Sequence, residues 1–88
     1  MKELNFDEPV IYTGPNVYIY GVMQFQVYSE GLPDFVSRAI EKIPEIKDLI
    51  VPVSMLEKTR AKLAESGSYE NITFRKIQKA INEFRRKK

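Results

Sequence analysis

Hydrophobic and polar side chains alternate along residues 17–28 with the period of two that is typical of a β-strand. Before this segment, residues 10–13 are β-branched or aromatic, and Gly14-Pro15-Asn16 is a typical turn sequence. The pattern predicts a β-hairpin over residues 9–29 that has a short first strand and a long second strand. One face of the long strand would carry five hydrophobic residues: Val17, Ile19, Met23, Phe25 and Val27.

The hydrophobic residues after position 31 recur with a helical period. Between Leu32 and Ile43 they are spaced three or four apart, which predicts an amphipathic helix that Pro44 ends. Ser54-Met55-Leu56-Glu57 has the pattern of a capping box and predicts a helix to about Ser66. Thr73 is suited to cap the last helix. The apolar stripe of that helix would be Phe74, Ile77, Ala80, Ile81 and Phe84.

Residues 45–53 are compatible with two structures. Ile46, Leu49, Ile50 and Val53 keep helical spacing, but residues 49–53 are also rich in the β-branched residues of a short strand. The spacing slightly favours a short helix broken by Pro52. A third strand over residues 49–53 remains the alternative.

These elements predict one domain, residues 1–88, of the α+β class, with an N-terminal β-hairpin packed against three to four short helices. Residues 1–8 are polar and acidic and are expected to form a loose arm. Residues 32–88 would be the helical part, which ends in a basic tail, residues 85–88. The expected core consists of Val17, Ile19, Phe25, Phe35, Ile40, Leu56, Leu63, Ile77, Ile81 and Phe84.

The composition removes several kinds of chemistry. The chain has no cysteine and no histidine, so thiolate catalysis, disulfides and the commonest general base and metal ligands are absent. Glu41, Glu45 and Asp48 lie near one another, but Pro44 interrupts their spacing. We therefore expect a protein that is not an enzyme and that has no cofactor and no metal site. Because no apolar run could span a bilayer and no signal peptide is evident, we expect no membrane and a cytoplasmic location.

Charge is divided unequally along the chain. Residues 1–55 carry four basic and eight acidic side chains, a net charge of −4, whereas residues 56–88 carry ten basic and four acidic ones, a net charge of +6. Basic clusters bind phosphate backbones through counterion release, although they are also ordinary on solvated helices. Lys58, Arg60 and Lys62 lie on the preceding predicted helix. The candidate contacts to nucleic acid are Arg75, Lys76, Lys79, Arg85, Arg86 and Lys87.

The second face of the predicted long strand carries Tyr18, Tyr20 and Tyr28 together with Gln24 and Gln26. Such a face could stack unpaired bases, contact another protein, or pack inside the domain itself. The strand has no proline and no charged residue between positions 17 and 29, so its edge could also pair with a second copy or another protein.

The sequence thus predicts a small non-catalytic accessory protein that binds DNA or RNA through a basic C-terminal helix and tail. The alternative is a protein–protein interaction module, or a subunit of a larger complex, that uses the tyrosine-rich hairpin face or its free edge strand. A homodimer through the hairpin belongs to this alternative.

Overall fold

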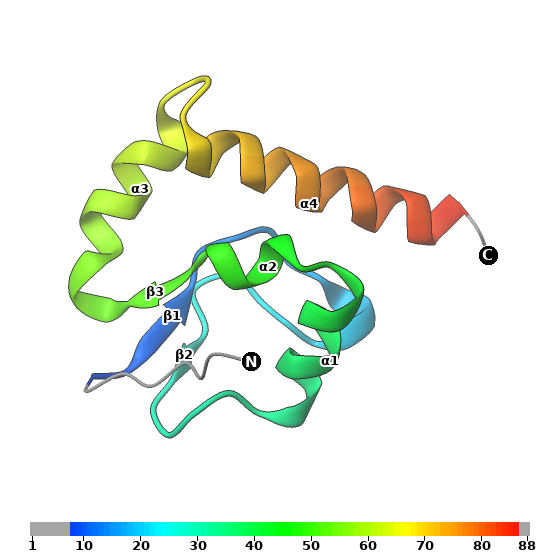
Figure 1. Ribbon diagram of the computed structural model, residues 1–88, viewed down its shortest axis with the longest axis horizontal. Coiled ribbons are helices and arrows are strands. Elements are labelled where there is room, and N and C mark those ends of the chain that lie inside the picture. The colour runs from blue at the N-terminus through cyan, green and yellow to red at the C-terminus, as the bar shows by residue number, and fades with distance from the viewer. Residues whose placement is uncertain (1–7, 87–88) are drawn as a thin grey trace.

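A computed structural model describes residues 8–86 and has the predicted α+β class, with a three-stranded antiparallel sheet and four α-helices (Figure 1). The strand order is β2-β1-β3, so the first strand is central. The strands are β1 (Val10–Tyr12), β2 (Val27–Tyr28) and β3 (Ile50–Pro52). The helices are α1 (Asp34–Lys42), α2 (Glu45–Asp48), α3 (Leu56–Ala64) and α4 (Tyr69–Arg86), and two 3-10 turns are η1 (Tyr18–Tyr20) and η2 (Val53–Met55).

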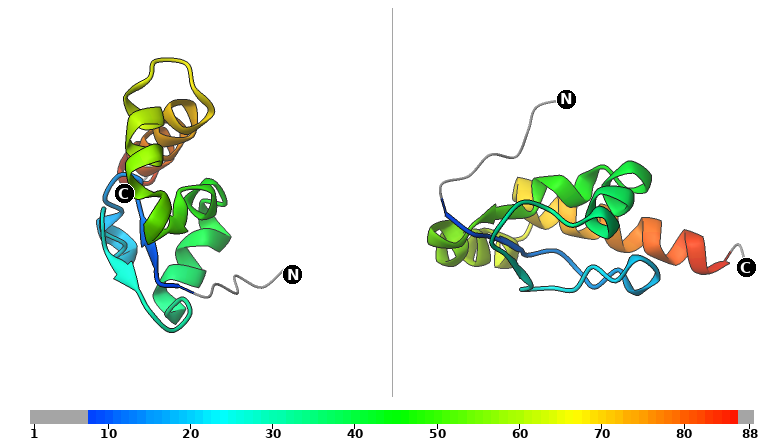
Figure 2. Two further views of the ribbon diagram at one scale, coloured as in Figure 1. Left: turned by 90° about the vertical axis from the view of Figure 1, so that its left-hand side faces the viewer. Right: turned by 90° about the horizontal axis from the view of Figure 1, so that it is seen from below.

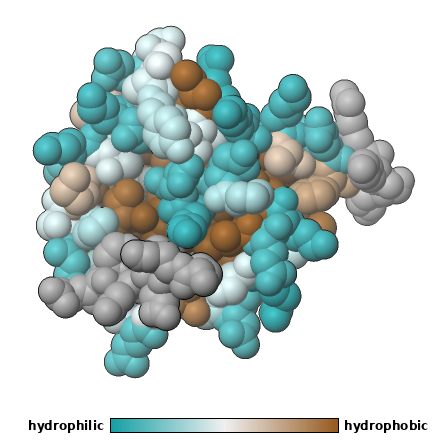
Figure 3. Space-filling view, in the orientation of Figure 1, coloured by the Kyte–Doolittle hydropathy of each residue, from teal (hydrophilic) through white to brown (hydrophobic). Residues whose placement is uncertain are grey.

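Helix α4 is the longest element, with 18 residues, and crosses one side of the molecule (Figures 1 and 2). It packs against both α3 and α2. It begins four residues before the predicted cap, because the Ser68 hydroxyl accepts a hydrogen bond from the Asn71 amide at 3.0 Å. Hydrophilic residues cover most of the rim of the face in Figure 3, and hydrophobic atoms reach the surface mainly in its middle.

The core lies where the sheet meets α1, α2 and α4. Its largest fully buried side chains are those of Tyr12, Ile43, Ile46, Leu49 and Ile77. Two members of the expected core are not in it: Ile19 is 67% exposed and Phe25 is 44% exposed. Of the other expected members, Val17 and Ile77 are buried, and those that are partly buried are Phe35, Ile40, Leu56, Leu63, Ile81 and Phe84.

The predicted long strand over residues 17–28 is wrong, and only its last two residues form a strand. Val17 instead pairs with Val22 in an isolated bridge that closes the 3-10 turn η1. Gly21 ends this turn with a φ of 79°, a left-handed conformation that glycine adopts without steric cost. A second left-handed residue, Phe25, follows at a φ of 67°. Two reversals of this kind are incompatible with one extended strand, and they turn residues 17–26 into a compact loop.

The ambiguous segment forms both predicted structures in succession. Residues 45–48 are helical, as the spacing favours, but residues 50–52 pair with β1, so a helix that continues to Pro52 is wrong. The backbone amide and the side-chain hydroxyl of Thr13 both donate to the Leu49 carbonyl, each at 2.8 Å. Pro52 is tolerated because it lies at the end of an edge strand.

No helix within residues 8–86 combines the length and the apolar composition that crossing a lipid bilayer requires. The predicted arm over residues 1–8 lies outside the described residues, apart from Glu8. So does the end of the basic tail, residues 87–88.

Candidate functional site

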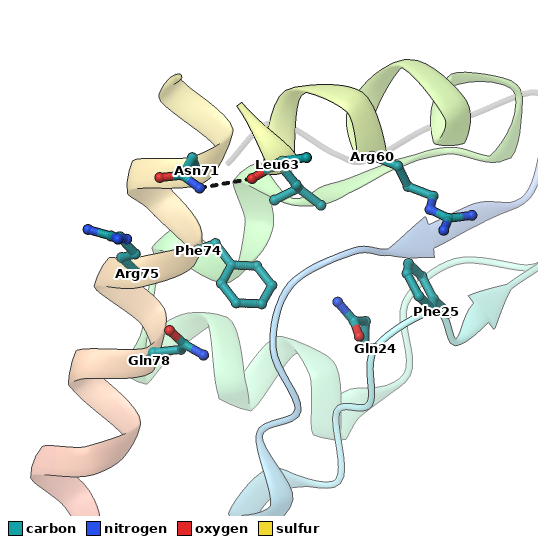
Figure 4. Close-up of a pocket in the computed structure, with 9 residues that line it drawn as sticks. Gln24, Phe25, Arg60, Leu63, Asn71, Phe74, Arg75 and Gln78 are labelled. Atoms are coloured by element: carbon teal, nitrogen blue, oxygen red, sulfur yellow. Dashed lines mark hydrogen bonds between the residues drawn. The ribbon is translucent and has the colours of Figure 1, made fainter. Parts of the chain in front are cut away.

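A pocket of about 430 Å³ opens between α3, α4 and the turn that precedes β2 (Figure 4). We call it the α3–α4 pocket. Its wall combines two aromatic rings, two arginines and three side-chain amides with apolar residues at the base of α3. The lining residues are Gln24, Phe25, Arg60, Leu63, Ala64, Asn71, Phe74, Arg75 and Gln78.

Phe25 forms one wall of the pocket from an unusual backbone conformation. Its φ of 67° makes it the only non-glycine residue with a positive φ in the described part of the chain. Its amide donates to the Tyr12 carbonyl at 2.6 Å, which ties the turn to β1. The guanidinium of Arg60, from α3, lies 5.6 Å from the centre of the Phe25 ring, within the range of a cation–π contact.

The amide side chains of the pocket come from two directions. Gln24 is held on the loop side, because its backbone amide donates to Asn16 Oδ1 at 2.7 Å and its Nε2 donates to the Thr13 carbonyl at 3.2 Å. Gln78 projects into the pocket from α4 (Figure 4). Asn71 Nδ2 donates to the Leu63 carbonyl at 2.8 Å and so joins the start of α4 to the end of α3. Gln24 Oε1 and the Gln78 side-chain amide make no hydrogen bond within the described part of the chain, so both can bond to a ligand.

The buried phenol of Tyr12 holds the turn that follows β1. Its hydroxyl donates to the Pro15 carbonyl at 2.7 Å. Burial, and to a smaller extent the neighbouring Tyr28, raise the pKa of the Tyr12 phenol far above its ordinary value. Tyr12 therefore stays neutral and keeps its hydrogen bond at any physiological pH.

One side of α4 carries only amide and arginine side chains. Residues spaced alternately four and three apart share one side of a helix. We call this set the amide–arginine row, and Arg75 in it points away from the pocket centre in Figure 4. The row consists of Asn71, Arg75, Gln78, Asn82 and Arg85.

The row is free of acidic residues, although Glu70 and Glu83 belong to the same helix. Lys79 neighbours the row, because it is four residues after Arg75 and three before Asn82, whereas Lys76 is not three or four residues from any member of the row. Among the side chains of residues 8–85, the only ion pair joins Lys62 to Glu65, at 3.8 Å between exposed side chains. The arginines beside the pocket are thus not neutralised by a described carboxylate.

A second cleft of about 460 Å³ lies further along α4, and we call it the Tyr18 cleft. It is mainly apolar. Tyr18, which is 72% exposed, and Ile19 form its wall on the η1 turn, and Ile81, Phe84 and Arg85 form its wall on α4. Arg85 therefore belongs to both the cleft and the amide–arginine row.

The tyrosines and glutamines predicted to share a strand face are separated in the structure. Tyr18 is exposed on η1, Tyr20 is half-buried, and Tyr28 is buried in β2. Gln24 lines the α3–α4 pocket, whereas Gln26 is exposed and does not line it. The reason is the loop described above, which replaces the strand whose alternation would have aligned them.

The predicted basic residues are only partly brought together. Arg75, Lys79 and Arg85 lie on or next to the row, and Lys76 does not. The backbone of Arg86 ends α4, and Lys87 lies outside the described residues.

Phe25 and Gln78 are pocket residues that sequence reasoning missed, and Arg60 was recognised only as a basic residue. The alternation of hydrophobic and polar residues predicted Phe25 to be in the core, because no sequence pattern indicates a phenylalanine with a positive φ. The amide–arginine row, in contrast, was readable from its spacing of four and three. No group of three or more acidic side chains close enough to hold a metal ion occurs in the described part of the chain.

A comparison of this chain with known protein families, curated proteins and solved structures finds no match. The chemistry of the pocket is therefore the guide to function. Aromatic rings and a guanidinium plane stack on flat groups, amides both donate and accept hydrogen bonds, and unpaired arginines attract anions.

Proposed function

We propose that this protein is a non-catalytic accessory protein that binds nucleic acid through the surface made by α3, α4 and the loop before β2. The observation that carries the proposal is the amide–arginine row, which has no acidic member and runs directly past the α3–α4 pocket. Arginine and amide side chains on one helix side are the groups that commonly contact phosphates and bases.

The phosphate contacts would come from the exposed cations on and beside the row, namely Arg75, Lys79 and Arg85. Arg60 faces the same pocket from α3. Each phosphate that a cation neutralises releases counterions, so binding should weaken steeply as salt is added. An acidic residue inside the row would weaken binding of a polyanion, and neither Glu70 nor Glu83 is three or four residues from a member of the row, although Glu83 neighbours Lys79.

Two triple variants with the same net charge test the location of the surface. One removes Arg75, Lys79 and Arg85 by substitution with glutamine, and the other removes Lys42, Lys47 and Lys76 in the same way. The proposal predicts that the first variant binds a fluorescein-labelled oligothymidylate at least about tenfold more weakly, with a smaller salt dependence. The second should bind almost as the unaltered chain does. Equal losses in both variants would show diffuse charge attraction and contradict the proposed surface.

A second candidate function is protein binding at the Tyr18 cleft. Tyr18 and Ile19 are large, strongly exposed hydrophobic neighbours, and such residues are enriched at protein contacts. The edge strand β2 follows η1 along the chain but has only two residues, Val27 and Tyr28. Sedimentation velocity over a range of concentrations tests the homodimer. Reversible association that Tyr18→Ser abolishes would support it, and a monomer at every concentration would exclude it.

A further inference from the structure

We infer that the α3–α4 pocket holds an unpaired nucleobase, so that the protein prefers single-stranded over double-stranded nucleic acid. This inference rests on the proposed function and names the part of the ligand that enters the pocket. Phosphate contacts alone do not distinguish paired from unpaired strands, whereas a pocket that takes in a base does.

Two phenylalanine rings line the pocket. Phe25 lies on the loop side and Phe74 on α4, and both line the same opening (Figure 4). Aromatic side chains stack bases of any sequence, because every base has a π-face. The guanidinium of Arg60 over the Phe25 ring adds a cation that can stack on the base or contact its phosphate.

Phe25 also has a strained backbone conformation. A bulky residue with a φ of 67° is sterically unfavourable, and glycine or asparagine would adopt this conformation more readily. Burial of the ring in the core does not offset this strain, since Phe25 is 44% exposed. Binding of a ligand by the ring would explain why a strained, exposed aromatic residue lies at the wall of a pocket.

The pocket also offers hydrogen-bonding groups to a ligand. Gln24 Oε1 can accept while its Nε2 is held by Thr13, and Gln78 can both donate and accept. Primary amides are suited to the edges of unpaired bases. In a duplex these edges are paired and the base faces are stacked, so a duplex could fill the pocket only after a base left the stack.

The experiment compares three labelled probes of about 12 nucleotides: an oligothymidylate, an abasic strand with the same phosphates, and a duplex. Fluorescence anisotropy with the full chain should show that the oligothymidylate binds about tenfold more tightly than either other probe. Phe25→Asn, which suits the left-handed backbone but lacks the ring, should lose this preference, and so should Phe74→Leu. Phe25→Tyr should retain it, and so should Tyr69→Leu, which alters an exposed tyrosine at the start of α4 that does not line the pocket.

The outcomes separate the two proposals. Equal, salt-sensitive binding of the oligothymidylate and the abasic strand would overturn the base pocket and leave the phosphate-binding surface intact. Absence of binding to every probe at low salt would overturn both. Circular dichroism of each variant shows whether it folds, and the Phe74→Leu variant keeps the test decisive if Phe25→Asn does not.

Discussion

The guanidinium of Arg60 lies 5.6 Å from the centre of the Phe25 ring, so a residue of α3 and a residue of the loop before β2 form one wall of the pocket. The two residues are far apart in sequence and belong to different parts of the fold. Their contact is the point at which the basic C-terminal helices meet the aromatic N-terminal half. We therefore propose that binding depends on the geometry of this pair and not on the charge of α3 alone.

Substitution of Arg60 by lysine tests that statement. Lysine keeps the charge but lacks the planar group that stacks on an aromatic ring. We expect Arg60→Lys to weaken binding of an oligothymidylate by about three- to tenfold while the slope of affinity against salt stays nearly the same. Anisotropy titrations at several salt concentrations measure both quantities. An affinity equal to that of the unaltered protein would mean that Arg60 acts only as a charge.

Ile77 anchors α4 to the rest of the fold. Its side chain is fully buried, whereas Ile72 on the same helix is 44% exposed. Ile77→Ala should lower the free energy of unfolding by about 2–5 kcal/mol, because it removes buried surface and leaves a cavity. Ile72→Ala is the matched control and should cost less than about 1 kcal/mol. Urea denaturation followed by circular dichroism measures both, and equal losses would contradict the observed packing of α4.

Close approach of the Tyr12 phenol to Gly14 leaves no room for a side chain there. A Cβ atom on Gly14 would lie 2.5 Å from Tyr12 Oη and 2.7 Å from Cζ, and the tyrosine is fully buried and cannot move aside. Gly14→Ala should therefore destabilise the fold by about 1–3 kcal/mol. In a Tyr12→Leu background, which lacks these ring atoms, the same substitution should cost much less. A double-mutant cycle by urea denaturation gives the coupling, and additive losses would contradict the contact.

The Tyr12 phenol also makes a prediction about alkaline pH. Its pKa is raised by burial in the folded state and is near 10 in the unfolded chain, so the unfolded state loses its proton first. The contribution of this group to stability is fully present below about pH 10 and falls as pH rises from there toward the folded pKa. The free energy of unfolding of the unaltered protein should thus decrease between about pH 9 and 11, by up to about 1.4 kcal/mol per pH unit from this group.

Tyr12→Phe provides the comparison. The variant should lose less stability over the same pH range, and Tyr28, whose pKa burial also raises, accounts for part of what remains. Urea denaturation at a series of pH values measures the difference. Parallel curves for the two proteins would show that Tyr12 does not titrate differently in the folded and unfolded states.

The two most amphipathic helices, α1 and α4, were largely predictable because each carries its own hydrophobic stripe. Regular spacing of hydrophobic residues defined α1 and the apolar stripe of α4, and Pro44 ended α1 as expected. The loop over residues 17–26 was not predictable from alternation. Its shape depends on left-handed backbone at Gly21 and Phe25 and on hydrogen bonds to β1, and these involve residues that are distant in sequence.

The candidate site was also predictable only in part. Charge asymmetry indicated the C-terminal helices, and the helical spacing of Arg75, Lys79 and Arg85 places them on or next to one side of α4. The pocket itself was hidden, because Phe25 and Arg60 meet only through the tertiary fold. Tyr28 shows the opposite error. The sequence predicted that its ring binds a partner or a base, but the ring is buried in the fold and lies against Phe35, with 6.5 Å between the centres of the two rings.

The most direct test of nucleic-acid binding is an anisotropy titration of the full, unaltered chain against a labelled oligothymidylate at about 50 and 200 mM salt. We expect micromolar or tighter binding at the lower salt and at least about tenfold weaker binding at the higher salt, because several arginine and lysine side chains would displace counterions. No binding at the lower salt would contradict the proposed function and favour protein binding at the Tyr18 cleft instead.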